Sequence, residues 1–124
     1  ANRLKVIRAG TEQAAAFCEA DEAWTVDLVM AVDEACQNVI RHAYVGWDEP
    51  GDIVVDFIRD RDRLIVHLMD FADPVDQSKI KSRDLDEVRP GGLGVHLIKS
   101  VTDEAIFVDP PEGVGNLFKL TKRL

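Results

Sequence analysis

The stretch TVDLVMAVDEACQNVIRHAY, from Thr25 to Tyr44, predicts one long helix around which the rest of the chain is organised. No glycine or proline interrupts these twenty residues, and Thr25 can cap the first turn. Apolar residues recur at steps of three and four, which predicts a stripe that faces a core; they are Leu28, Val32, Ala35, Val39 and Ala43.

A second stripe of the same helix carries polar groups. Met30, Glu34, Asn38 and His42 lie four residues apart, so a carboxylate, an amide and an imidazole project from one face. Asparagine is a poor helix former because its amide competes for backbone hydrogen bonds, so Asn38 suggests a task beyond helix formation. A buried amide that ties two elements together and a solvated Glu34 are the structural alternatives. The Glu-x-x-x-Asn spacing alone is therefore a weak signal.

The composition is that of a soluble globular domain. The chain has 124 residues, of which 46% are hydrophobic and 31% charged, so a single domain spanning residues 1–124 is expected. No apolar run approaches the roughly 20 residues of a membrane span. A start at Ala1 without methionine suggests a trimmed chain or a domain of a longer protein.

The net charge argues against a nucleic-acid-binding site, and the cysteine spacing argues against a zinc site. Fifteen basic and 23 acidic residues give a net charge of −8, which argues against direct binding to the phosphate backbone of nucleic acid. Cys18 and Cys36 lack any spacing typical of zinc ligands, so they are predicted to be small buried hydrophobes in a reducing, cytosolic compartment.

The segments before the central helix are predicted as a strand and a helix. RLKVIR, from Arg3 to Arg8, alternates apolar and basic residues imperfectly, which favours an edge strand. From Thr11 to about Glu22 the apolar residues return to helical spacing, with Thr11 as the cap.

A hairpin is predicted after the central helix. The turn-rich segment from Gly46 to Asp52 comes first. Two runs rich in Val, Ile and Leu, Ile53–Arg59 and Leu64–Met69, then flank a short charged link, which is typical of antiparallel neighbours. Asp70 stands at the end of the second strand.

A polar segment and a glycine-rich helix start follow. The twenty residues from Phe71 to Pro90 have no regular pattern and are interpreted as a functional lid, with a disordered surface insertion as the alternative. Gly91, Gly92 and Gly94 then open a helix that runs to about Val101, where uncovered backbone N–H groups can bind an anion. Glycines in a tight turn are the structural alternative.

Two more strands, Ala105–Val108 and Leu117–Leu120, close the chain around a turn from Asp109 to Gly115. Strands come in adjacent pairs and do not alternate regularly with helices. This order predicts the α+β class, with a mixed, mostly antiparallel sheet and helices layered on one face.

The order of these motifs resembles the Bergerat ATP-binding fold of the GHKL superfamily. Glu34 and Asn38 on a helix, Asp70 at a strand end, a lid, and Gly92-Leu93-Gly94 at a helix start follow one another as in that superfamily. Within it, DEACQNVIRHAY and the ending GNLFKLTKRL look like the anti-sigma-factor serine/threonine kinases of the RsbW and SpoIIAB type.

The resemblance implies a role for each motif residue. Asn38 matches the amide that coordinates the Mg²⁺ on the ATP phosphates, and Glu34 matches the general base for the substrate serine. Asp70 matches the carboxylate that accepts a hydrogen bond from the adenine amino group. Gly92, Leu93 and Gly94 match the phosphate-contacting end of the lid, and His42 falls near the pocket.

Two positions depart from the family pattern. Ala72 stands where a glycine is usual, so it denies a positive φ at low cost and adds a methyl group that faces the base. Asn116 stands where a threonine is common, so a hydroxyl contact to the nucleotide is replaced by an amide or lost. Nucleotide binding is expected to survive, in weakened form.

The resemblance also implies the partners. The phosphate acceptor would be a serine or threonine on a STAS-domain anti-anti-sigma protein, and the same domain would sequester a sigma factor, as a homodimer in the cytoplasm. Mg-ATP would be the phosphate donor, with a lid cation among Lys79, Lys81, Arg83 and Arg89. A nucleotide-gated binding module without chemistry and the ATP-binding domain of a sensor histidine kinase are the alternatives.

Overall fold

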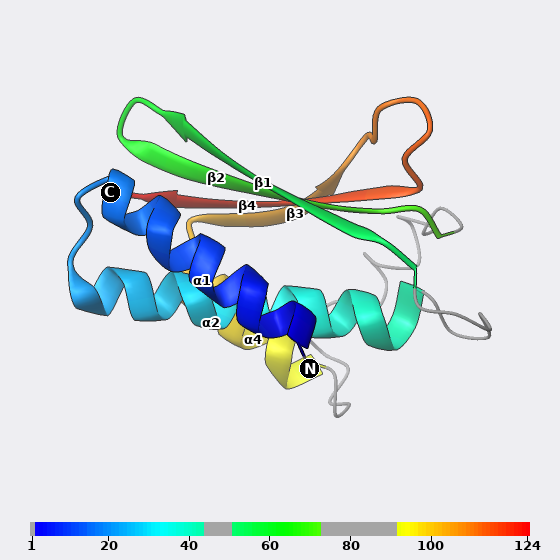
Figure 1. Ribbon diagram of the computed structural model, residues 1–124, viewed down its shortest axis with the longest axis horizontal. Helices are drawn as coiled ribbons and strands as arrows, with labels where there is room; N and C mark the ends of the chain where they lie inside the picture. Colours follow the sequence, from blue (N-terminus) through cyan, green and yellow to red (C-terminus); the bar gives the residue numbers. More distant parts are fainter. Residues whose placement is uncertain (1, 44–50, 73–91) are drawn as a thin grey trace.

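Four antiparallel strands form a sheet, and helices α1, α2 and α4 lie on one of its two faces (Figure 1). The computed structural model describes residues 2–43, 51–72 and 92–124. The described elements, in chain order, are α1 (Asn2–Phe17), α2 (Glu22–Asn38), the π-helix η1 (Val39–Ala43), β1 (Ile53–Asp60), β2 (Arg63–Asp70), α4 (Gly92–Val101), β3 (Glu104–Val108) and β4 (Asn116–Arg123). The predicted α+β class, with helices on one face of the sheet, is confirmed.

Two predicted segments lie mostly or partly outside the described residues. They are the turn from Gly46 to Asp52 and the lid from Phe71 to Pro90, which contains the four candidate lid cations. Tyr44, the expected last residue of the central helix, also lies outside them.

The strand predicted from Arg3 to Arg8 is wrong, because this segment is the first half of α1. Leu4 and Ile7 pack against the core, and Thr11 and Ala15 are fully buried, so the inward positions follow one another at helical spacing across the whole element. Thr11 is not a cap. Its Oγ1 donates to the carbonyl oxygen of Ile7 at 2.7 Å, within the helix.

The central helix begins three residues before the predicted Thr25 and changes its form at Asn38. Asp21 is the N-cap, since its carboxylate accepts the backbone N–H of Trp24 at 2.8 Å. The hydroxyl of Thr25 instead donates to the backbone carbonyl of Asp21. At the other end the α-helix passes into the π-helix η1, a form that occurs in short pieces and frequently at functional sites.

The four strands predicted after the central helix are confirmed, with their ends shifted by a few residues at most. β1 and β2 form a hairpin in which Asp60 pairs with Arg63, and Arg61 in the turn has a φ of 59°. The sheet order is β1-β2-β4-β3, so β4 lies between β2 and β3 and pairs with both. The pairing of β4 with β2 places the last residue of β2, Asp70, opposite the first residue of β4, Asn116.

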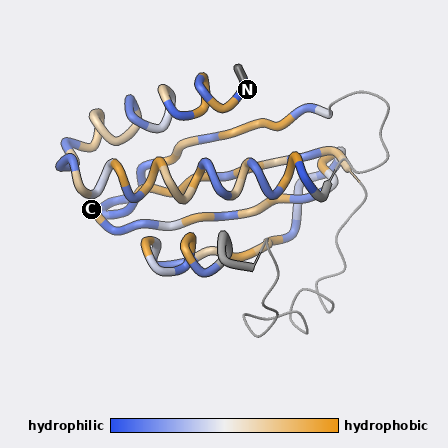
Figure 2. Tube along the Cα trace, turned by 90° about the horizontal axis from the view of Figure 1, so that it is seen from below, coloured by the Kyte–Doolittle hydropathy of each residue, from blue (hydrophilic) through white to orange (hydrophobic). Residues whose placement is uncertain are grey.

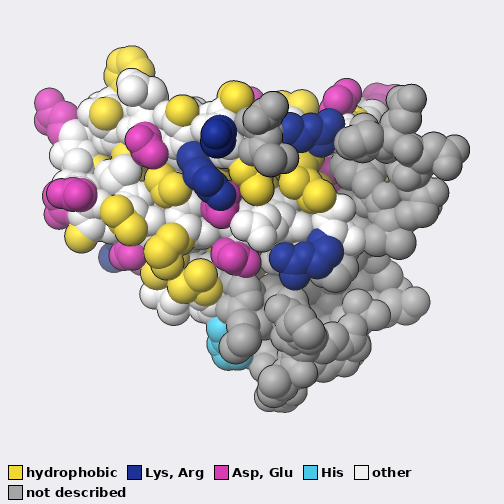
Figure 3. All heavy atoms as spheres, turned by 60° about the horizontal axis from the view of Figure 1, so that its bottom comes forward, with side chains coloured by type: hydrophobic (Ala, Val, Ile, Leu, Met, Phe, Trp, Pro, Cys, Tyr) yellow, Lys and Arg dark blue, Asp and Glu magenta, His cyan; other side chains and the backbone are white. Residues whose placement is uncertain are grey.

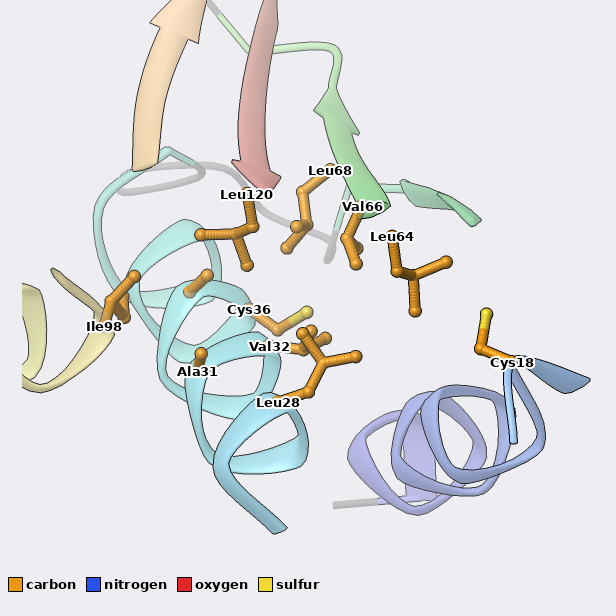
Figure 4. Packing of buried hydrophobic residues seen from close by; sticks show 11 residues of the cluster. Cys18, Leu28, Ala31, Val32, Cys36, Leu64, Val66, Leu68, Ile98 and Leu120 are labelled. Atoms are coloured by element: carbon orange, nitrogen blue, oxygen red, sulfur yellow. The ribbon is translucent and has the colours of Figure 1, made fainter. Parts of the chain in front are cut away.

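The core lies between the sheet and α2, as Figure 4 shows. Inward side chains of β2 and β4 meet those of α2, and Ile98 of α4 and Cys18 close the two sides. Leu28, Val32 and Ala35 of the predicted apolar stripe are buried, while Val39 is half-buried and the side chain of Ala43 lies outside the described ones. Both cysteines are free and buried, as the sequence predicts.

Among the described residues, none of the helices is both long and apolar enough to cross a lipid bilayer.

Lys122 ties three elements together, and its replacement is the first testable prediction. Its Nζ donates to the carbonyl oxygen of Val101, the last residue of α4, and lies 5.6 Å from the centre of the Trp24 ring. Cations stabilise helix C-termini and aromatic faces, so Lys122→Met should lower the free energy of unfolding by about 1 to 2 kcal/mol. Urea denaturation measures this, with Lys5→Met on the exposed side of α1 as the control. Equal losses for the two variants would contradict this role for Lys122.

Candidate nucleotide site

The side-chain oxygen of Asn38, at the last turn of α2, is buried and has no hydrogen-bond partner among the described residues. Asn38 Oδ1 is one of two buried side-chain polar atoms in the described part of the chain that have no partner, the other being Thr121 Oγ1. An unsatisfied buried oxygen costs roughly 1–3 kcal/mol, so its presence calls for an explanation. A ligand that binds this oxygen provides one.

Glu34 lies one turn before Asn38 and is half-buried. It makes no hydrogen bond or ion pair within the described residues, whereas its neighbour Asp33 is fully engaged. Arg8 donates to both oxygens of Asp33, at 2.9 and 3.2 Å, and Gln37 donates to Oδ2 at 3.0 Å. The Asp33 carboxylate in turn raises the pKa of Arg8. Of the two adjacent carboxylates, Glu34 is therefore the one available to a substrate.

Asp70 forms a second polar cluster with Asn116 and Ala72. Asp70 is 4% exposed, and its Oδ1 accepts the side-chain Nδ2 of Asn116 at 3.0 Å and the backbone N–H of Ala72 at 3.1 Å. These two donors fix the carboxylate plane. They occupy two of the roughly four acceptor positions of a carboxylate, so acceptor capacity remains for a ligand.

Ala72 adopts its conformation without backbone strain. The non-glycine residues with positive φ in the described ranges are Glu19 and Arg61, so Ala72 is not among them. Ala72 is 4% exposed and continues the turn that Asp70 begins. The alanine in place of the usual family glycine is therefore compatible with this turn.

Gly115 supports the Asp70 cluster, a role that the sequence does not predict. Its N–H donates to the backbone carbonyl of Asp70 at 2.8 Å. A Cβ atom at this position would lie 1.9 Å from the carbonyl oxygen of Ala72, a distance that no real side chain tolerates. Only glycine lets the start of β4 pass this close to the turn after β2. The Gly-Asn pair at the head of a strand was the one signal that could have indicated it.

Gly92 and Gly94 lie at a helix start, as predicted, because α4 begins at Gly92, while Gly91 lies outside the described residues. The first turn of an α-helix has backbone N–H groups without intrahelical partners, and here these belong to residues such as Leu93 and Gly94. The side chains of Leu93 and His42 lie outside the described ones, so the structure gives only their backbone positions, on α4 and η1.

These parts converge on one end of the molecule. In Figure 1 the end of α2 with η1, the end of β2 and the start of β4 lie at the same end of the layers, and Figure 2 shows the start of α4 directed toward that end as well. Helices α2 and α4 pack against each other. The sheet thus contributes Asp70 and Asn116, and the helical layer contributes Glu34 and Asn38.

Among the candidate site residues, Asn38 is the one best suited to be a ligand of Mg²⁺. Amide and carboxylate oxygens suit Mg²⁺, which keeps most of its shell for water and phosphate. The described residues contain no group of three His, Cys, Asp or Glu side chains that could hold a metal by themselves. Burial, and then the charge of Asp33, raises the pKa of the Cys36 thiol to about 12.

Comparison with known proteins gives the family. The family model described as a histidine kinase-like ATPase domain matches residues 1–122. The chain therefore belongs to the histidine kinase-like ATPase domain family. The histidine kinase domain of the blue-light-activated kinase EL346 from Erythrobacter litoralis has a similar fold, with a TM-score of 0.59 at 14% identity over 82% of this chain and 45% of that one. The mycobacterial sensor histidine kinase MprB has a TM-score of 0.53 at 16% identity, over 81% and 74%.

The curated relatives by sequence are serine-protein kinases named RsbW. The protein from Bacillus pumilus (strain SAFR-032) is 39% identical over 88 residues, which cover 63% of this chain and 54% of that protein. The protein from Staphylococcus aureus is 30% identical over 105 residues, or 78% and 66%. The chain thus spans little more than half the length of the first of these relatives.

Proposed function

We propose that this chain is the ATP-binding domain of an anti-sigma factor that is also a protein serine/threonine kinase. It would phosphorylate a STAS-domain anti-anti-sigma protein and sequester a sigma factor. The observation that carries the proposal is the buried oxygen of Asn38, one turn from Glu34, with neither group paired to another side chain in the described part of the chain. The names of the RsbW relatives support the same activity. Residues 1–124 would form one domain that works in the cytoplasm as a homodimer.

Each residue of the site has a proposed task. Asn38 would hold Mg²⁺ through Oδ1, and the N–H groups at the start of α4, from Gly92 to Gly94, would bind phosphate. Asp70 would accept the adenine amino group, with Asn116 holding the carboxylate in place. Ala72 and His42 would border the nucleotide. Bound Mg-ATP would supply the transferable phosphoryl group and the cation that neutralises its charge.

Glu34 would act on the acceptor hydroxyl. It would take the proton as the serine oxygen forms its bond to the γ-phosphorus and the bond to the β-phosphate oxygen breaks, so ADP leaves with the electron pair. Arg8 and Gln37 would keep Asp33 out of this role, since their hydrogen bonds already engage it.

Transfer to the partner tests the activity. Incubation with radiolabelled ATP, Mg²⁺ and the cognate STAS protein should give an acid-stable phosphoserine or phosphothreonine on that protein. Tight Mg-ATP binding without any transfer would instead identify a nucleotide-gated binding module. An acid-labile product would indicate histidine phosphorylation, and either result would overturn the proposal.

The role of Asp70 predicts a change in base selectivity. A hydrogen bond to a charged group contributes about 1.5–3 kcal/mol, so Asp70→Asn should weaken ATP binding by about 10- to 100-fold. Inosine triphosphate, which lacks the amino group, should lose far less affinity. Calorimetry with both nucleotides measures this, with Asp109→Asn in the exposed turn after β3 as the control. Equal losses for ATP and inosine triphosphate would remove Asp70 from adenine recognition.

The role of Asn38 predicts a change in metal dependence. Chelation of Mg²⁺ should weaken ATP binding to the parent protein by about tenfold or more, because even indirect metal contacts are worth 10- to 100-fold. Asn38→Ala should bind ATP weakly with or without Mg²⁺. Gln37→Ala, one residue earlier, should keep the parental metal dependence. An Asn38→Ala variant that still responds to Mg²⁺ like the parent would place the metal elsewhere.

A further inference from the structure

The outer edge of β3 is an open strand edge within the described part of the chain. The sheet order β1-β2-β4-β3 gives β3 a neighbour on one side only (Figure 1). In an antiparallel strand, successive residues direct their N–H and C=O groups alternately to the two sides. About half of the backbone groups of β3 therefore point away from β4, with no strand beside them among the described residues.

β3 lacks several of the devices by which proteins usually protect such an edge. Those devices include shortened strands, lysine, proline and bulges. The five residues of β3 are close to the mean strand length, and their register with β4 is unbroken from Glu104 to Val108. After Glu104 the strand reads AIFV, and prolines come only at 110 and 111. An edge of this kind is a template for a further strand.

A hollow lies beside this edge, where α4 gives way to β3. Its volume is about 280 Å³, and it is lined by Lys99, Thr102, Asp103, Glu104, Ala105 and Ile106. Two of the lining side chains are acidic and one is basic. Small-molecule pockets begin at roughly 300 Å³, so this hollow suits one side chain of a larger partner. Backbone pairing along a sheet edge, with pockets for side chains, is one way in which proteins bind extended peptides.

The two faces of β3 differ, and this difference sets the side chains that a partner strand needs. Ala105 packs against the core, and Phe107 lies against Phe118 with ring centroids 4.9 Å apart, so both project toward the helices. Glu104 and Ile106 project to the opposite side, where Ile106 is 43% exposed. Residues directly opposite each other on adjacent strands interact, so a partner should place a basic residue beside Glu104 and an apolar one beside Ile106.

The charge around β3 also favours a basic partner. Asp103 and Glu104 come at its start, Asp109 and Glu112 follow its end, and all four are exposed. No lysine or arginine occurs between residues 102 and 113 of the sequence. The edge strand on the other side, β1, carries Arg59 together with aspartates. Complementary charge speeds the encounter with a basic segment and fixes its register.

The helical layer has a different character. Apolar side chains there lie in small groups among acidic and basic ones (Figure 3). Single exposed apolar residues of this kind are normal on a protein surface, so they give less reason to expect a partner than the open backbone edge of β3 does.

We propose that the outer edge of β3 binds an extended, basic segment of a partner protein, which adds an antiparallel strand to the sheet. The main chain of that segment pairs with β3, a basic residue meets Glu104, and an apolar residue covers Ile106. Glu104 pairs with Thr121, which lies roughly 16 Å along β4 from Asn116 in the candidate nucleotide site. Affinity for Mg-ATP is therefore an independent readout, and the proposal goes beyond the proposed function.

A synthetic strand tests the proposal on the intact chain. The blocked peptide KTTVTKK would place its valine beside Ile106 and a lysine beside Glu104 in an antiparallel register. Fluorescence polarisation should show saturable binding, which should weaken by at least about tenfold when prolines replace the two adjacent threonines, because proline cannot donate to a strand ladder. The peptide ETTVTEE should also bind at least about tenfold more weakly. No saturable binding of KTTVTKK up to about 1 mM, or equal binding of the three peptides, would overturn the proposal.

Hydrogen exchange locates the bound peptide. KTTVTKK should slow the exchange of the outward-pointing amides of β3 by about tenfold or more and leave those of β1 unchanged. Protection of β1 instead would contradict the assignment to β3. Protection of β3 that grows with protein concentration in the absence of peptide would identify a second copy of the chain as the occupant, and would likewise overturn the proposal.

Charge reversal tests the register. Glu104→Lys should weaken the binding of KTTVTKK by at least about tenfold and strengthen that of ETTVTEE. The ion pair that this change removes, with Lys119, is long at 3.6 Å and partly exposed, so the fold should be kept. Glu12→Lys, an equal change at an exposed position of α1, is the matched control and should leave both affinities unchanged.

Both variants should retain the parental circular dichroism and Mg-ATP affinity. If they lost affinity for KTTVTKK equally, the peptide would be responding to the net charge of the chain and not to the edge of β3, which would rule the proposal out.

Discussion

Glu34→Gln is expected to slow phosphoryl transfer to the partner protein by about 10²- to 10⁴-fold, the usual contribution of a positioned general base. Glutamine keeps the size of the side chain and removes its ability to take a proton. The affinity for Mg-ATP should stay within about twofold, because the change removes an interaction made with the acceptor and not with the nucleotide. Single-turnover transfer from radiolabelled ATP and nucleotide titration measure the two effects separately.

The neighbouring carboxylate supplies the control. Asp33→Asn breaks the bidentate ion pair with Arg8, whose side chain is 44% exposed, so it should cost only about 0.2–1 kcal/mol of stability. The transfer rate should remain close to that of the parent. If the two variants lost activity equally, the proton acceptor would not be Glu34 specifically. Full activity of Glu34→Gln would remove the general base from the proposed mechanism.

The sequence predicts an element best where its signal is long and uniform. The interior of α2 and the hairpin of β1 and β2 follow from uninterrupted apolar periodicity, and both are confirmed. The segment from Arg3 to Arg8 fails because six residues with scattered basic side chains fit a strand as well as a helix. The inward positions Leu4, Ile7 and Thr11 decide the matter only when the window reaches into the next segment.

The ends of elements depend on interactions that a pattern does not carry. Asp21 caps α2 through one side-chain contact, which competes in the sequence with the equally plausible Thr25. The change from α-helix to π-helix after Asn38 depends on which carbonyl each N–H selects. The predicted stripe with four-residue spacing assumes an α-helix, and the α-helix of the structure ends at Asn38.

The residues of the candidate site also differ in how far the sequence predicts them. Glu34 and Asn38 could be singled out because a polar pair at helical spacing is visible within one segment. The contact between Asp70 and Asn116 joins residues 46 positions apart and exists because β4 pairs with β2 in a particular register. From the sequence, Asn116 is expected to replace or lose a hydroxyl contact to the nucleotide; in the structure its amide donates to the carboxylate of Asp70.

Gly115→Ala should disturb the contact between Asp70 and Asn116 strongly. The added Cβ would lie 1.9 Å from the carbonyl oxygen of Ala72, and a backbone atom cannot turn aside as a flexible side chain can. The start of β4 would have to move, which would strain or break two hydrogen bonds, from Gly115 N–H to the Asp70 carbonyl and from Asn116 to the Asp70 carboxylate. Overpacking and lost hydrogen bonds together should lower the free energy of unfolding by about 3 kcal/mol.

The affinity for nucleotide should fall together with the stability, since Asp70 would lose its fixed orientation. A Gly115→Ala variant that still folds at low temperature should bind ATP at least about tenfold more weakly and discriminate less against inosine triphosphate. Gly10→Ala is the matched control. Its Cβ would meet the Phe57 ring at an ordinary 3.7 Å, so in the interior of α1 it should stabilise the protein by about 0.5–1 kcal/mol. Urea denaturation measures the stability of both variants, and calorimetry measures their affinity for ATP and inosine triphosphate. If the Gly115→Ala protein were as stable and as selective as the parent, the close approach of β4 to Ala72 would not be what holds the Asp70 carboxylate in place.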